Sequence, residues 1–115
     1  MARSSINIRM ATSYIYVIGS DSPPYKVGIS KAPDQRLRSL QTGHPQKLRI
    51  HSLKETDTEK TKLLERVIHH HLKHHRTHGE WFDLDLKSIM LEVEYALIRY
   101  EDDPSLRTRV RDKWF

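Results

Sequence analysis

The fold is decided by residues 14–19, YIYVIG, whose β-branched and aromatic side chains favour an extended strand. Residues 20–24, SDSPP, are typical of a turn, because serine, aspartate and proline all suit tight changes of chain direction. A second run of strand character, residues 25–30, follows directly. The two runs therefore predict a β-hairpin.

A helix is expected after this hairpin. Pro33 suits the first turn of a helix, and Leu37 and Leu40 recur at a spacing that places both on its inner side. Gly43 and Pro45 then end the helix. The pattern predicts a short amphipathic helix that lies against the sheet.

One more strand and two more helices are expected in the rest of the chain. Residues 47–53 alternate, with Leu48 and Ile50 facing one way, as in a half-buried strand. Thr56, with Glu59 three residues on, resembles a capping box that opens a helix, and a last helix begins near residue 84 and ends at Pro104. The side chains expected to be buried on these two helices are Leu63, Leu64, Val67, Ile68, Leu72, Leu86, Ile89, Met90, Val93, Ala96 and Leu97. The predicted class is α+β, a small three-stranded antiparallel sheet flanked by helices.

Composition restricts the classes of function. The chain has 115 residues, with 20 Lys and Arg against 15 Asp and Glu, a formal charge of +5 and a pI near 9.6. A basic balance favours polyanionic partners, because each cation placed on a phosphate releases condensed counterions. The absence of cysteine excludes disulfides and thiolate metal sites. No run approaches the length needed to span a membrane, so a soluble, cytoplasmic protein without membrane contact is expected.

Four short motifs together resemble the GIY-YIG endonuclease superfamily. They are the pair Tyr14-Ile15-Tyr16 and Tyr25-Lys26-Val27-Gly28, then Arg36, then Leu64-Glu65 with His69, and finally Gly79-Glu80-Trp81-Phe82. The last two are similar to a phage-associated branch of that superfamily. The resemblance implies a nuclease domain over residues 13–103, with a flexible arm over residues 1–12 and a basic tail over residues 104–115.

The resemblance also implies roles for particular residues. Tyr16 corresponds to the tyrosine that ends the first motif, Arg36 to the arginine of the first helix, and Glu65 to the single metal-binding glutamate. His69 resembles the family's helix histidine and lies one helical turn after Glu65. Lys26 occupies the position of a motif tyrosine, and because strand side chains alternate, Lys26 rather than Tyr25 is expected on the active-site face.

The chemistry of phosphodiester hydrolysis suits these residue types. Glu65 can hold a hard divalent cation, Mg²⁺ or Mn²⁺. Tyr16 would act as general base if its pKa, ordinarily near 10, is lowered by the metal or by Arg36 and Lys26. Arg36 offers a planar fork to phosphate oxygens. The expected activity is metal-dependent hydrolysis of DNA.

One active site per chain predicts nicking of a duplex or cutting of a single strand by a monomer, although a dimer would allow both strands to be cut. The cations expected to contact nucleic acid are Arg38, Arg107, Arg109, Arg111 and Lys113.

Two alternatives stay open at this point. The altered motif at Lys26 and the basic tail also suit a protein of this fold that binds nucleic acid without cutting it. Six histidines within residues 69–78, including His70 and His74 four apart, suit a zinc site. Trp81 and Phe82 are expected in the core, and Glu80 is a candidate to anchor Lys26 or Arg36.

Overall fold

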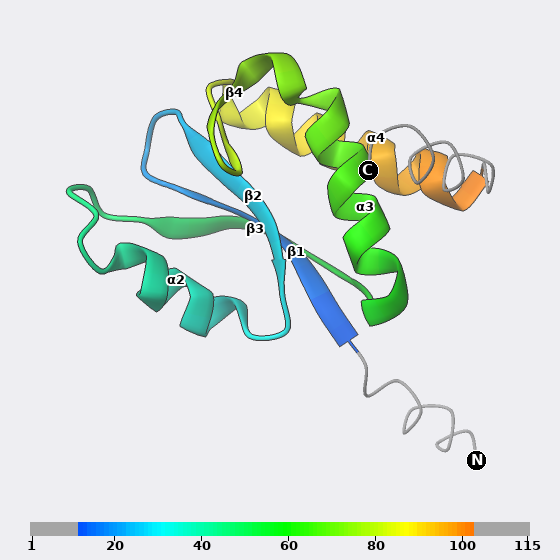
Figure 1. The fold of residues 1–115 in the computed structure, drawn as a ribbon, viewed down its shortest axis with the longest axis horizontal. Coiled ribbons are helices and arrows are strands. Elements are labelled where there is room, and N and C mark those ends of the chain that lie inside the picture. Colours follow the sequence, from blue (N-terminus) through cyan, green and yellow to red (C-terminus); the bar gives the residue numbers. More distant parts are fainter. Residues whose placement is uncertain (1–11, 103–115) are drawn as a thin grey trace.

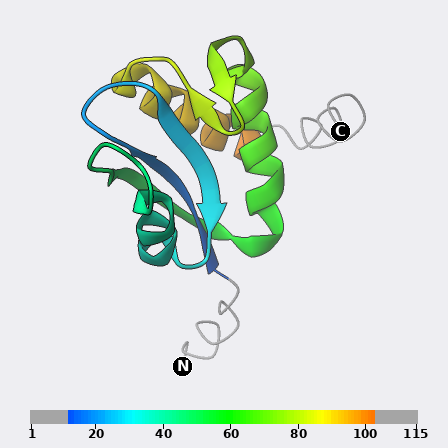
Figure 2. The same ribbon diagram turned by 60° about the vertical axis from the view of Figure 1, so that its left-hand side comes forward.

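A computed structural model describes residues 12–102 and shows an antiparallel sheet with helices on both faces. The strand order across the sheet is β3-β1-β2-β5-β4. Figure 1 shows α2 on one side of the sheet and α3 and α4 on the other, and Figure 2 shows the same three layers after rotation. The elements in chain order are β1 (Thr12–Gly19), β2 (Tyr25–Ser30), α2 (Pro33–Gln41), β3 (Arg49–Asp57), α3 (Thr58–His71), the short 3-10 helix η1 (Lys73–His75), β4 (Arg76–His78), β5 (Trp81–Phe82) and α4 (Leu86–Asp102).

The predicted hairpin is confirmed. β1 pairs with β2 in a register that sets Tyr16 opposite Gly28 and Ile18 opposite Lys26. β3 pairs with the other edge of β1, and it extends to Asp57, beyond the predicted end at residue 53. Of the three strands predicted from the sequence, β1 and β2 are therefore inner strands of the sheet and β3 is an edge strand.

The sheet has five strands, so the prediction of three was wrong. Trp81 pairs with Lys26 and Phe82 with Tyr25, which adds β5 to the edge of β2, and β4 pairs with β5 in turn. Gly79 has a φ of +53°, in the left-handed region that suits glycine, at the turn between β4 and β5. Strands of two and three residues are too short to show an alternating pattern, so only their pairing with β2 identifies them.

The two faces of the sheet carry separate apolar clusters. The larger cluster lies under α3 and α4 and contains Ile15, Val17, Tyr25, Val27, Leu64, Val67, Ile68, Leu72, Phe82, Ile89, Val93 and Ala96. The smaller lies under α2 and consists of Tyr16, Ile18 and Leu48, with Leu37, Leu40, Ile50 and Trp81 packed against it. The alternation along β1 thus sends Ile15 and Val17 to one core and Tyr16 and Ile18 to the other.

The helix boundaries differ from the prediction at two places. Thr56 still belongs to β3, so the predicted capping box does not form; α3 begins at Thr58, and its N-cap, Asp57, makes no side-chain capping bond. The last helix begins at Leu86, where the Asp85 carboxylate accepts a hydrogen bond from the Ser88 backbone N–H at 3.0 Å.

Most of the predicted helical core is buried, but Met90 is 37% exposed and was wrongly expected inside. It lies at the edge of the apolar face of α4. The predicted arm over residues 1–12 lies outside the described residues except for its last residue, and the predicted end of the last helix at Pro104 lies outside them entirely.

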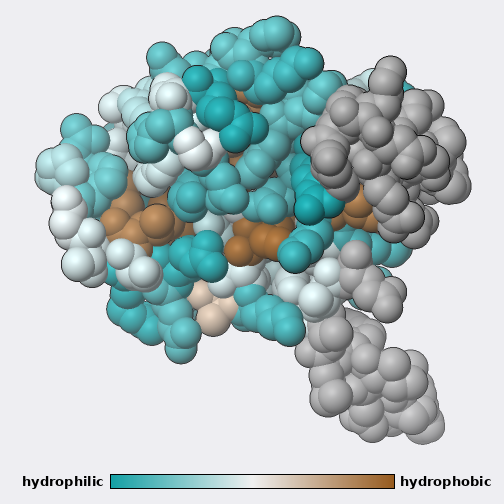
Figure 3. Space-filling model, viewed as in Figure 1, coloured by the Kyte–Doolittle hydropathy of each residue, from teal (hydrophilic) through white to brown (hydrophobic). Residues whose placement is uncertain are grey.

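The surface drawn in Figure 3 is mostly hydrophilic, with small separate apolar areas. Within residues 12–102, no helix combines the length and the apolar character that a membrane crossing demands.

Candidate active site

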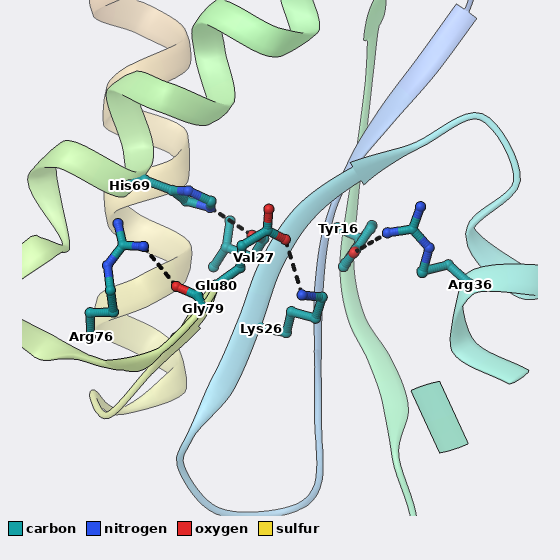
Figure 4. Close-up of polar contacts among 8 residues, drawn as sticks. All are labelled: Tyr16, Lys26, Val27, Arg36, His69, Arg76, Gly79 and Glu80. Atoms are coloured by element: carbon teal, nitrogen blue, oxygen red, sulfur yellow. Dashed lines mark hydrogen bonds and ion pairs between the residues drawn. The ribbon is translucent and has the colours of Figure 1, made fainter. Parts of the chain in front are cut away.

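The candidate site lies at the edge of β2, where β5 begins. The Val27 backbone N–H donates to the carbonyl oxygen of Glu80, the residue before β5, at 3.1 Å. The Val27 carbonyl oxygen instead accepts a hydrogen bond from His69 Nε2 at 2.7 Å. No residue of β5 pairs with β2 beyond Lys26, and α3 brings His69 against this edge of the sheet. Figure 4 shows side chains from β1, β2, α2, α3 and the β4–β5 turn gathered there.

Tyr16 occupies the floor of the site. Its side chain is fully buried, and Arg36 Nη1 donates a hydrogen bond to its hydroxyl oxygen at 3.0 Å. Gly28 makes room for this hydroxyl, because a Cβ there would collide with it and would lie 3.2 Å from Glu80 Oε1. The missing side chain at Gly28 thus lets the phenol and a carboxylate converge beside the strand.

Lys26 and Glu80 form an ion pair next to this opening. Lys26 Nζ lies 3.0 Å from Glu80 Oε1, and the Lys26 side chain is only 13% exposed. Tyr25 points the other way, into the larger core, at 3% exposure. The expectation that Lys26 rather than Tyr25 faces the site is therefore confirmed in geometry, as is the anchoring of Lys26 by Glu80.

Glu65, on α3, has an unusual acidity. Burial and, next, the negative charge of Glu80 raise the pKa of its carboxyl to about 7, against the opposite effect of Lys26, Arg66 and Arg36. Two carboxylates in one half-buried place are mutually repulsive unless a cation or a proton lies between them. The acidic side of the site therefore favours a bound cation at neutral pH.

His69 is held as a neutral imidazole with a defined tautomer. Burial lowers its pKa, and its ring packs against Phe82 with 5.2 Å between the ring centroids. A carbonyl oxygen only accepts, so Nε2 must carry the proton that is donated to Val27. This leaves the Nδ1 lone pair as the acceptor of the ring. Histidines that bind metals usually donate their second ring nitrogen to such a carbonyl.

The three side chains together have the donor set of a divalent metal site. One ligand atom from each of Glu65, His69 and Glu80 lies within 4.8 Å of the other two, and all three residues are half-buried. Two carboxylates and one imidazole together could hold a metal ion. The sequence pointed to Glu65 alone as metal ligand; Glu80 follows a glycine turn, and only the pairing of β5 brings it to α3.

Tyr16 is less acidic than expected. Burial raises its pKa above the usual value, the charge and hydrogen bond of Arg36 lower it, and the carboxylates Glu80 and Glu65 raise it. Arg36 thus lowers this pKa, as expected, but burial outweighs it, so the net shift in the protein alone is upward. The reason is that the sequence did not reveal how completely the phenol is buried between strand and helix.

The other candidates lie elsewhere. Arg38 is exposed in the last turn of α2. Arg107, Arg109, Arg111 and Lys113 lie outside the described residues.

The predicted zinc site required His70 and His74 to lie four residues apart on one helix. That arrangement is not present, because α3 ends at His71 and the chain continues as η1. Across residues 12–102, the group of Glu65, His69 and Glu80 is the one set of three side chains with metal-site geometry.

Comparison with known proteins agrees with this arrangement at the level of the family. The T5orf172 domain matches residues 13–95, which span β1 to most of α4 and include all the side chains of the site. No curated protein and no solved structure matches the chain. The chain therefore belongs to the T5orf172 domain family, a phage-associated family that is often related to nucleases.

Proposed function

We propose that this protein is a metal-dependent endonuclease of the GIY-YIG type that hydrolyses phosphodiester bonds in DNA. The observation that carries the proposal is the convergence of the Tyr16–Arg36 pair with the Glu65, His69 and Glu80 group around Gly28. A nucleophile-activating hydroxyl, a fixed cation and a set of metal ligands at one place are the parts that phosphodiester hydrolysis needs. The family and the basic charge of the chain point the same way.

A divalent cation would be held by the carboxylates of Glu65 and Glu80, with the imidazole of His69 as the third candidate ligand. When bound, it would withdraw charge from a phosphate oxygen and offset the charges of Glu80 and Glu65, which add to the effect of burial in raising the Tyr16 pKa. His69 keeps its orientation through the hydrogen bond to Val27 whether or not its other nitrogen is engaged. The residues present therefore fit a cation of the Mg²⁺ or Mn²⁺ class.

Tyr16 is proposed as the general base. Its deprotonated hydroxyl would take a proton from the attacking water as the new bond to phosphorus forms and the bond to the leaving oxygen breaks. Arg36 stabilises the phenolate, because it donates a hydrogen bond to that oxygen. The pKa of Tyr16 is raised in the protein alone, chiefly by burial and to a smaller extent by the charges of Glu80 and Glu65, and a cation at those carboxylates would offset the charge effect.

Arg36 and Lys26 are proposed to bind the phosphate. Arg36 is exposed and reaches over the buried hydroxyl of Tyr16, so a phosphate bound by its guanidinium comes to lie above that hydroxyl. Arg36 must shift for the hydroxyl to become accessible. Lys26 supplies a second, less exposed cation beside the same opening.

Each chain carries one such site, so one encounter cuts one strand. We therefore propose that the first product from a duplex is a nick, made by a monomer. The basic residues Arg38, Arg107, Arg109, Arg111 and Lys113 are proposed to contact the DNA backbone.

Incubation with supercoiled plasmid tests the proposal. The protein is expected to convert supercoiled plasmid to nicked circle in Mg²⁺ or Mn²⁺ and to leave it intact in EDTA. Glu65→Gln is expected to abolish cutting while DNA binding and the fold are retained, because an amide holds a divalent cation poorly. The matched control is Glu92→Gln, which changes a carboxylate that lies on α4 and contacts His71 instead. Binding without cutting by the unaltered protein in either metal would contradict the proposal and favour a non-cutting nucleic-acid-binding protein.

A further inference from the structure

Beside the candidate site lies an array of aromatic rings built around Trp81. The His44 ring lies nearly parallel to the indole, with 5.7 Å between centroids and 24° between planes. The His78 ring is also nearly parallel, at 6.3 Å and 18°. Trp81 and His44 are half-buried and His78 is exposed, so the array has one side in the core and one side at the surface.

Hydrogen bonds orient the two histidine rings. His44 Nδ1 accepts from the Gln46 backbone N–H at 3.2 Å, which fixes the loop after α2. His78 Nδ1 lies 3.2 Å from the Thr77 hydroxyl, and that hydroxyl donates to the Trp81 carbonyl oxygen at 3.3 Å. The rings come from a loop and two strands and are preorganised before any ligand binds.

The array is joined to the candidate site through Lys26. Lys26 stands opposite Trp81 in the sheet, so both side chains lie on the same face. The Lys26 ammonium lies 5.9 Å from the centre of the Trp81 ring and 3.0 Å from Glu80 Oε1. Lys26 therefore lies between the aromatic array and the groups proposed to bind phosphate and metal.

We propose that Trp81, with His44 and His78, is a stacking platform for an unpaired base of the DNA strand whose phosphate enters the site. The inference rests on the proposed action on DNA. A base in an intact duplex is stacked on its neighbours and hidden from such a platform, whereas an unpaired base offers its whole face. Aromatic platforms next to cationic grooves are how proteins commonly hold single strands without reading their sequence. The expected substrate class is a single-stranded or locally unpaired segment.

The test is a binding measurement in EDTA, which separates it from cutting. In a Trp114→Phe background, Trp81 is the single tryptophan of the chain, so its fluorescence reports on this place alone. A single-stranded oligonucleotide is expected to quench that fluorescence, and the matching duplex much less. Equal quenching by single strand and duplex, or none by either, would overturn the inference.

A second arm separates base stacking from phosphate contacts. Trp81→Leu keeps an apolar group against the smaller core but removes the aromatic face. It is expected to weaken binding of a single-stranded oligonucleotide by about tenfold, the scale of one stacked base. Binding of an oligonucleotide with abasic sites, which keeps every phosphate, should be nearly unchanged by the same substitution. Tyr95→Leu is the matched control, because Tyr95 is an exposed aromatic on α4.

Equal losses on normal and abasic oligonucleotides, or no loss on either, would contradict the platform. If Trp81→Leu does not fold, as judged by its thermal unfolding, His78→Ala takes its place. His78 is exposed, and the same contrast between normal and abasic strands is expected. If the protein never cuts DNA but shows base-dependent quenching, the proposed nuclease activity is refuted and the stacking platform is supported. If it cuts DNA without base-dependent quenching, the nuclease activity is supported and the stacking platform is refuted.

Discussion

Lowering the pH from about 8 to about 6 is expected to weaken divalent-metal binding at Glu65, His69 and Glu80 by about tenfold. The carboxyl of Glu65 has a pKa of about 7 in the metal-free protein, because it is buried and lies near the charge of Glu80. The ionised fraction is then roughly ten in eleven at the higher pH and one in eleven at the lower. Only the ionised form of Glu65 binds the metal, so the apparent affinity changes by the ratio of the two ionised fractions, about tenfold.

The structure also says which group is responsible. The pKa of His69 is lowered, chiefly by burial, so its imidazole is neutral near pH 7. Glu80→Gln removes a charge that raises the pKa of Glu65, so that variant should bind metal more weakly but lose less affinity between the two pH values. Titration calorimetry with Mn²⁺ at both pH values measures these quantities. An affinity that is equal at both would refute the assignment of Glu65 as a ligand with a raised pKa.

The stability of the metal-free protein should show the opposite trend. The pKa of Glu65 is about 7 in the folded state against about 4.5 when unfolded, so the folded state binds more protons between these values. The contribution of Glu65 to the free energy of unfolding therefore rises as the pH falls from about 8 to about 5. The difference in thermal unfolding between the unaltered protein and Glu65→Gln isolates this contribution, and saturating Mn²⁺ should suppress it. A melting temperature of the unaltered protein that rises relative to that of Glu65→Gln as the pH increases would contradict the sign.

Three substitutions and one combined replacement test other parts of the site. Tyr16→Phe should reduce the cutting rate by about a hundredfold or more with little change in stability, since it deletes only a hydroxyl; parental activity in the plasmid assay would leave Tyr16 as a packing residue. Arg36→Lys should also lose cutting activity, because an ammonium lacks the guanidinium fork. Cutting at the parental rate by this variant would show that the fork geometry has no role. Gly28→Ala should lower the free energy of unfolding by about 1–3 kcal/mol, since its Cβ meets the Tyr16 hydroxyl, and chemical denaturation measures this. An unchanged denaturation midpoint for Gly28→Ala would mean that the Tyr16 phenol can move aside. Replacing the exposed His74 and His75 with glutamine should leave metal-dependent cutting largely intact, and loss of bound zinc together with a lower melting temperature would revive a zinc site.

The sequence by itself determined the elements whose patterns are local. Residues 14–19 and 25–30 specify the hairpin through β-branched and aromatic side chains, and the turn between them follows from its serines and prolines. The apolar spacing of α3 places Leu64, Val67 and Ile68 in the core. Tyr16, Arg36 and Glu65 were found because their motifs keep a characteristic spacing, and the facing of Lys26 followed from strand alternation.

The tertiary structure alone decided features that depend on contacts between distant segments. β4 and β5 exist because β2 offers an unpaired edge, and their few residues carry no periodicity of their own. That pairing carries Glu80 to within 3.0 Å of Lys26, 54 residues away in the chain, and makes it a third ligand candidate beside Glu65 and His69. The pKa of Tyr16 is raised rather than lowered because burial, which no local pattern records, outweighs the nearby guanidinium. Local propensity specifies which elements form, whereas the free energy of a charge depends on everything packed around it.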